Sequence, residues 1–112
     1  MAITEDKLNS IIKGFISRLS NEIDISEVVL FGSYVTGNAM DHSYIDLAII
    51  SDSFLDQSHL KNMQFLSKIA ANYNSLIEAI PFTLQEYKNL DKRTLLAGIL
   101  KSGRRIPLDK TS

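Results

Sequence analysis

A helical repeat of hydrophobic residues marks two long stretches of this 112-residue chain. In the first, apolar side chains recur at helical spacing from Ile3 to Leu19, which predicts an amphipathic helix over residues 4–21 with Thr4 as its N-cap. In the second, the same spacing runs from Leu60 to Tyr73, and Asn74 belongs to the polar sequence that ends it. Each helix therefore has an apolar face that another element must cover.

Short runs of apolar and β-branched residues predict three strands, over residues 28–31, 44–50 and 76–82. Pro81 has no backbone N–H to donate, so the third strand is expected at a sheet edge or to end there. Residues 83–86, Thr-Leu-Gln-Glu, match a capping box and predict the start of a helix. A further helix is expected over residues 92–102, stopped by Gly103 and followed by a short strand or an extended tail over residues 104–108.

The order of these elements predicts an α+β fold, in which a small mixed β-sheet of three or four strands is flanked by helices. The connection between the first two strands has about a dozen residues and is too irregular for a crossover helix, so a purely parallel sheet is not expected. The chain length predicts a single domain over residues 1–112.

Composition excludes several classes of protein. The chain has no cysteine, which rules out disulfides, thiolate metal sites and cysteine nucleophiles. Its net charge of -1 argues against a nucleic-acid coat, because such proteins carry a surplus of cations. No run of 18 apolar residues is present, and the amino terminus is polar and acidic, so we expect neither a membrane span nor a signal peptide. A cytoplasmic location is the corresponding expectation.

Charge is unevenly distributed along the chain. Residues 1–83 contain five basic and ten acidic residues, whereas residues 84–112 contain seven basic and three acidic ones. Two interpretations of the basic third stay open: a solvated helix face followed by a frayed end, or a contact for an anionic ligand or an acidic partner. Its basic residues are Lys88, Lys92, Arg93, Lys101, Arg104, Arg105 and Lys110.

The first predicted strand ends in Gly32 and Ser33, and a short helix is expected to follow. Glycine permits close approach of a ligand to the backbone, while the serine hydroxyl and the following amides can donate to phosphate oxygens. Two carboxylates, Asp46 and Glu78, interrupt the second and third apolar runs, where a charge is costly unless it is paired or binds a metal. If their strands are neighbours, these two acids could share a divalent cation, although each taken alone is more simply a solvent-facing acid.

These residues resemble a known family. The order Gly-Ser, ten residues, acid, any residue, acid is the signature of the DNA polymerase beta-like nucleotidyltransferases. Residues 29–34, Val-Leu-Phe-Gly-Ser-Tyr, resemble the minimal nucleotidyltransferases of bacteria and archaea, and the resemblance extends from Val28 to Ile106. It implies the nucleotidyltransferase fold and transfer of a nucleoside monophosphate from a nucleoside triphosphate, with ATP as the expected donor.

The resemblance also implies roles for individual residues. In the family the Gly-Ser turn binds the triphosphate, two acids on the following strand hold two magnesium ions, and an acid on a later strand completes the metal site or acts as general base. By position, Gly32 and Ser33 match the phosphate-binding turn. Asp46 matches the second acid and Glu78 is the best candidate for the third, which makes both of them expected catalytic and Mg²⁺-binding residues.

The family further implies an external partner, because such small proteins are commonly encoded beside a helical HEPN-type protein and act as its antitoxin. Adenylylation of that partner is then a candidate reaction. Self-association is also open, since small domains with apolar helix faces often form oligomers. A nucleic-acid partner is not expected.

One position departs from the family pattern, because Tyr44 stands where the first metal-binding acid belongs. A phenol is neutral near pH 7 and is a poor replacement for a carboxylate as a magnesium ligand. Three explanations stay open: the chain is a nucleotide- or partner-binding module with weak or no turnover, one metal held by Asp46 and Glu78 suffices, or Tyr44 is an altered residue.

Overall fold

The computed structural model describes residues 3–108, and its elements follow the predicted order. Helix α1 (Glu5–Ser20) leads into strand β1 (Glu27–Phe31), the short helix α2 (Ser33–Thr36) and strand β2 (Ile45–Ile50). A 3₁₀ turn, η1 (Asp52–Phe54), precedes helix α3 (His59–Tyr73) and strand β3 (Ile77–Phe82). The chain then forms α4 (Leu84–Lys88), α5 (Leu95–Ser102) and the short strand β4 (Arg104–Arg105).

The four strands form one mixed sheet in the order β3-β2-β1-β4. Strand β1 runs antiparallel to β2 and β4, whereas β2 and β3 are parallel and are joined through α3. This confirms the expected mixed sheet. The irregular connection through α2 reverses the chain direction between β1 and β2, whereas the longer connection through α3 lets β3 run in the same direction as β2. Pro81 lies in β3 at the sheet edge, as its missing N–H predicted.

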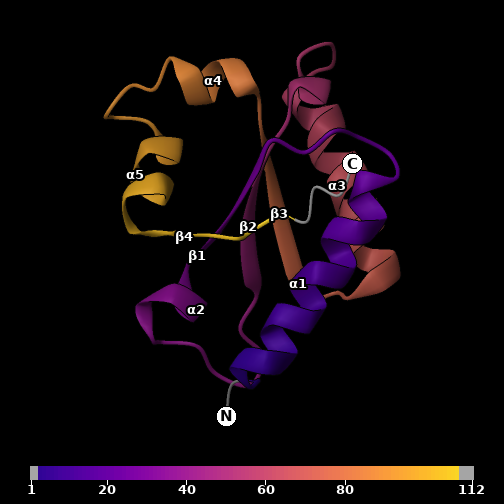
Figure 1. Ribbon diagram of the computed structural model, residues 1–112, viewed down its shortest axis with the longest axis vertical. Coiled ribbons are helices and arrows are strands. Elements are labelled where there is room, and N and C mark those ends of the chain that lie inside the picture. The colour runs from indigo at the N-terminus through magenta and orange to yellow at the C-terminus, as the bar shows by residue number, and fades with distance from the viewer. Residues whose placement is uncertain (1–2, 109–112) are drawn as a thin grey trace.

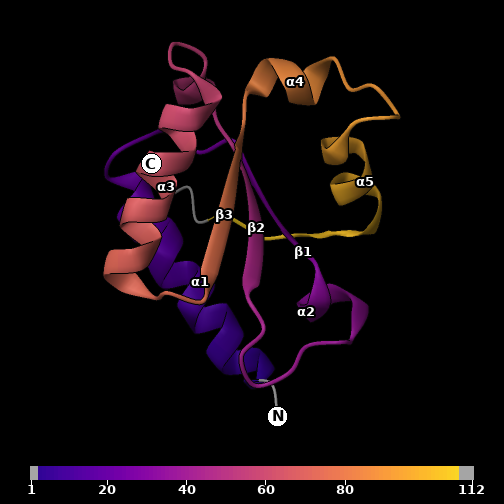
Figure 2. The same ribbon diagram turned by 180° about the vertical axis from the view of Figure 1, so that it is seen from behind.

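Helices cover both faces of the sheet (Figures 1 and 2). Helices α1 and α3 lie on one side, where the larger core cluster forms around buried side chains such as Phe15, Leu47 and Leu66. Helices α4 and α5 lie on the opposite side, where Val29, Ala48 and other buried residues form a smaller cluster. The second core is smaller because α4 and α5 are shorter than α1 and α3, so this face has less helical cover.

Side-chain caps fix where the helices begin. Thr4, Ser58, Thr83 and Thr94 each accept a hydrogen bond from a backbone N–H in the first turn of the helix that follows. Thr83 forms the predicted capping box, in which the Glu86 carboxylate accepts from the Thr83 backbone N–H at 3.0 Å.

The last helix starts later than the sequence pattern predicted. It was expected from Lys92, but α5 begins at Leu95. The Asp91 carboxylate accepts a hydrogen bond from the Arg93 backbone N–H at 2.9 Å, and this turn leaves Thr94 as the N-cap. The expected stop at Gly103 is confirmed, since this residue is the C-cap of α5.

The basic third of the chain is divided between the two sides of the sheet. Arg104 pairs with Glu5 of α1 at 2.8 Å, whereas Arg105 lies 3.7 Å from Glu27 and donates to the Tyr87 hydroxyl at 3.3 Å. These exposed pairs favour a solvated surface over one concentrated anion-binding patch. Lys110, which belongs to the same basic third, lies outside the described residues. Within residues 3–108, no helix combines the length and hydrophobicity needed to span a bilayer.

Candidate active site

The Gly32 turn connects β1 to α2 and depends on a backbone conformation that favours glycine. Gly32 has φ 80° and ψ -151°, a region that is almost confined to glycine. Its carbonyl accepts hydrogen bonds from Val35 N–H at 3.0 Å and Thr36 N–H at 3.1 Å, so the chain enters the helix at once. Ser33 is therefore placed, half-buried, in the first turn of α2, directly beyond the end of the strand.

Gly32 is also required by the space around it, because its Cα faces the side chain of Asp46. A Cβ atom at position 32 would collide with Asp46 Oδ2 and would lie 3.0 Å from Asp46 Cγ. The sheet causes this approach, since Phe31 and Asp46 are direct partners in the β1–β2 ladder. The predicted phosphate turn and the predicted catalytic acid therefore lie in contact.

The two predicted acids are neighbours across the sheet. Asp46 on β2 and Glu78 on β3 are register partners in the parallel pair, so their side chains leave the same face of the sheet. This is also the face of Ala48 and Ile50, which pack beneath α5, whereas Ile45 and Leu47 point into the opposite core. Successive side chains of β2 therefore alternate between the two faces of the sheet.

The electrostatics of the pair are asymmetric because Asp46 is partly buried and Glu78 is exposed. Burial raises the pKa of Asp46 above its ordinary value, and the negative charge of the neighbouring Glu78 raises this pKa further. Two carboxylates held side by side without a nearby cation repel each other, and a bound divalent cation would relieve that repulsion.

The donor set fits one magnesium ion better than two. Magnesium is usually held by one or two carboxylates, with water and substrate phosphates completing its octahedral shell, and Asp46 with Glu78 can supply that number. Within residues 3–108, no three His, Cys, Asp or Glu side chains gather closely enough to form a fuller metal site. Tyr44, at the position of the missing acid, is 55% exposed and lies one residue before β2.

The other candidate side chains lie away from this constellation or are engaged elsewhere. Tyr34, which could have stacked on a base or packed under the short helix, packs against the larger core and its hydroxyl is buried. No hydrogen-bond partner for that hydroxyl occurs in the part of the chain that the structure describes. His42 and His59 are both exposed.

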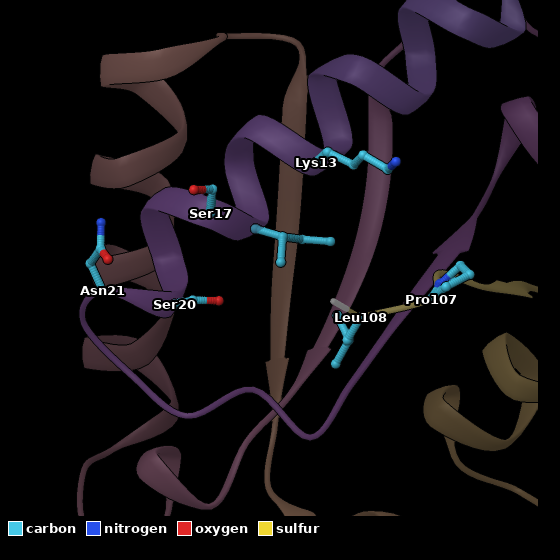
Figure 3. A pocket seen from close by; sticks show the side chains of 7 residues that line it. Lys13, Ser17, Ser20, Asn21, Pro107 and Leu108 are labelled. Carbon is cyan, nitrogen blue, oxygen red and sulfur yellow. The ribbon is translucent and has the colours of Figure 1, made fainter. Parts of the chain in front are cut away.

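A separate hollow of about 620 Å³ lies between α1 and the segment that follows β4. Figure 3 shows Lys13 and Ser20 of α1 projecting towards the side on which Pro107 and Leu108 lie. Ser17 of the same helix and its C-cap Asn21 also line the hollow. Sequence reasoning did not find this hollow, because its walls are far apart along the chain and contain no recognisable motif. It contains none of the predicted site residues.

Comparisons with known proteins identify the family and the fold. The family model described as polymerase beta, nucleotidyltransferase, matches residues 13–110. A crystal structure of a "putative nucleotidyltransferase" from Sulfolobus solfataricus superposes with a TM-score of 0.64, covering 88% of this chain and 78% of that chain. The two sequences are 16% identical, so this likeness concerns the fold. No curated protein matches the chain.

Proposed function

This chain belongs to the polymerase beta nucleotidyltransferase family, and on that premise we propose that it transfers a nucleoside monophosphate from a nucleoside triphosphate to a hydroxyl group of an external acceptor. The observation that carries the proposal is the contact between the Gly32 turn and Asp46, with Glu78 as the next side chain across the sheet. Phosphoryl transfer needs a phosphate-binding turn close to metal-binding acids, and the closeness of Gly32, Asp46 and Glu78 supports this assignment.

In this proposal each site residue has a distinct role. The backbone of Gly32 allows phosphate oxygens to approach closely, and the Ser33 hydroxyl donates a hydrogen bond to them. Asp46 and Glu78 hold a magnesium ion, whose charge, when it is bound, stabilises the oxygens that become negative during transfer. The short distance between turn and acids positions the triphosphate for in-line attack.

The acceptor is proposed to be a separate molecule. The helices and strands of residues 3–108 together build one small four-stranded α+β unit, which the nucleotide site itself occupies. The family resemblance favours a HEPN-type helical protein as that acceptor, ATP as the donor, an antitoxin role and a cytoplasmic location. The net charge of -1 argues against nucleic acid as the acceptor, since phosphate backbones are held by surplus cations.

A second candidate function is favoured by Tyr44. With only two acids in the site, the chain can bind nucleotide or a protein partner through the same fold without turnover. The two functions differ at the chemical step and not in the location of the site. Restoring a carboxylate at position 44 therefore separates them.

The decisive experiment incubates the chain with Mg²⁺ and labelled nucleoside triphosphates, with and without the protein encoded beside it. Parent, Asp46→Ala and Tyr44→Asp are compared. Transfer by the parent that is lost in Asp46→Ala supports the enzyme, whereas transfer only by Tyr44→Asp supports the binding module. If no form binds or transfers nucleotide, the enzyme and the nucleotide-binding module are both wrong.

A matched control separates loss of the site from loss of an acid in general. Asp56 is an exposed aspartate in the loop before α3, far along the chain from the Gly32 turn. Asp56→Ala should behave as the parent does in binding and in transfer. Equal loss in Asp46→Ala and Asp56→Ala would show that the effect does not come from the site.

A further inference from the structure

Tyr44 lies at the mouth of the candidate site. The Ile45 N–H donates to the Leu76 carbonyl at 2.7 Å, so the ladder between β2 and β3 begins immediately after Tyr44. By strand alternation, the Tyr44 side chain leaves the same face as that of Asp46. Residues two apart on a strand are about 6.6 Å apart and neighbouring strands about 4.8 Å, which places Glu78 within reach of a tyrosine side chain.

The phosphate turn approaches the same residue from the other side. The β1–β2 register ends at the pair Phe31–Asp46. Ser33 follows Phe31 by two residues and Tyr44 precedes Asp46 by two, so both lie beyond the same end of this ladder. The chain turns at Gly32, but α2 stays in contact with both β1 and β2. A triphosphate held at Ser33 would therefore lie at the same end of the sheet as Tyr44.

The other three tyrosines of the chain are occupied elsewhere. The Tyr34 hydroxyl is buried, the Tyr87 hydroxyl accepts a hydrogen bond from Arg105, and the Tyr73 ring lies 4.3 Å from the Arg18 guanidinium. Tyr44 combines an exposed side chain, at 55%, with a position directly before β2 and two residues ahead of Asp46. It is thus the phenol that a nucleotide in this site would meet.

We propose that Tyr44 is itself a nucleotidylylation site, so that the chain modifies its own tyrosine in cis; this inference rests on the proposed function. The Tyr44 hydroxyl oxygen attacks the α-phosphorus of a bound nucleoside triphosphate. A bond from this oxygen to the α-phosphorus forms, the bond from the α-phosphorus to the bridging oxygen breaks, and pyrophosphate leaves. The phenolic proton passes to the Glu78 carboxylate, and no oxidation or reduction occurs.

The product has a consequence for the site. The modified Tyr44 carries a negatively charged phosphodiester close to Asp46 and Glu78, and the nucleoside stays attached to this residue. Like charges at this distance repel, and the attached nucleotide occupies the space of the next substrate. Self-modification therefore stops after one nucleotide per chain and closes the site to further triphosphate.

The test uses the full chain with MgCl₂ and ATP, followed by intact-mass and peptide mass spectrometry. We expect the mass to increase by one adenylate per chain, with the label on the peptide that contains Tyr44. Tyr44→Phe should lose the label, while Tyr87→Phe, the matched tyrosine control, should be labelled as the parent is. The labelling half-time should not change over a hundredfold range of protein concentration, because the reaction is intramolecular.

Several results would overturn the inference. Label on another residue, persistence of label in Tyr44→Phe, or a rate proportional to protein concentration each contradicts modification of Tyr44 in cis. If MgATP raises the melting temperature or supports transfer to the neighbouring protein without labelling Tyr44, this inference fails and the proposed function stands. If MgATP neither stabilises nor labels the chain and no transfer occurs, both fail.

Discussion

The Cα of Gly32 faces the carboxylate of Asp46 so closely that a methyl group at position 32 would collide with Asp46 Oδ2. Asp46 lies one strand away from the turn and fourteen residues later in the chain. The phosphate-binding feature and the acid are therefore one structural unit, and a change in one displaces the other. This contact leads to the first prediction.

Gly32→Ala should lower the free energy of unfolding by about 1–3 kcal/mol, because alanine is strained at this φ and ψ. It should also abolish stabilisation by Mg²⁺ and nucleotide, since the new Cβ displaces the Asp46 carboxylate. Urea unfolding and thermal shift measure the two effects.

Gly37→Ala is the control, because Gly37 also has a positive φ, 86°, but a Cβ at this position would meet open space. The Gly37→Ala variant should lose stability and keep nucleotide binding. Equal binding by Gly32→Ala and the parent would contradict this account.

The raised pKa of Asp46 makes a prediction about pH in the absence of metal. Because the folded state binds the Asp46 proton more tightly than the unfolded state does, this group makes stability fall as pH rises. Stability falls as the pH rises from about 3.9, the pKa of Asp46 in the unfolded state, until it passes the raised pKa in the folded state. Asp46→Asn removes the titration, so it should be more stable than the parent at neutral pH.

Urea midpoints of parent and Asp46→Asn from pH 4 to pH 8 test this difference, with Asp56→Asn as the control for an exposed aspartate. The advantage of Asp46→Asn should grow from low to neutral pH. A constant difference across the range would show that Asp46 is not perturbed by burial and by Glu78. Saturating Mg²⁺ with nucleotide should reverse the order, since the parent alone keeps the carboxylate ligand.

Glu78 should matter for ligand binding and little for folding, because its side chain is exposed at the sheet edge. Magnesium with nucleotide at a hundred times its dissociation constant should stabilise the parent by about 2.7 kcal/mol. Glu78→Gln should reduce this gain while its unfolding free energy without ligand stays within about 0.5 kcal/mol of the parent. An undiminished gain in Glu78→Gln would remove Glu78 from the metal site.

Replacing two glycines of helix α5 and its C-cap by alanine should change the free energy of unfolding in opposite directions. Gly98 lies inside the helix with open space at its Cβ position, so Gly98→Ala should raise the free energy of unfolding by about 0.5–1 kcal/mol. Gly103 packs closely against β1, where a Cβ would lie 2.6 Å from Val29 Cγ1 and 2.9 Å from the Leu30 carbonyl oxygen. Gly103→Ala should cost about 1–3 kcal/mol. Urea unfolding measures both, and a stabilising Gly103→Ala would show that α5 is not held against the sheet by this contact.

The sequence determined the local structure, because the signals for helices, strands and caps are contained within a few neighbouring residues. The apolar repeat gave α1 and α3 nearly to the residue, and Thr83 with Glu86 gave the start of α4. Strand alternation placed Asp46 on the face opposite Leu47, and the Gly32 turn was evident from its residues alone.

Only the tertiary structure decided which strands are neighbours and in which register. The sequence singled out Glu78 as an acid in an apolar run, but only the placement of β3 beside β2 put it opposite Asp46. In the same way Arg104 and Arg105, adjacent in sequence, pair with acids on opposite sides of the sheet. Register depends on burying two faces at once among residues distant in the chain, and local periodicity does not contain that information. The acid pair and the contact of Asp46 with Gly32 both follow from that register.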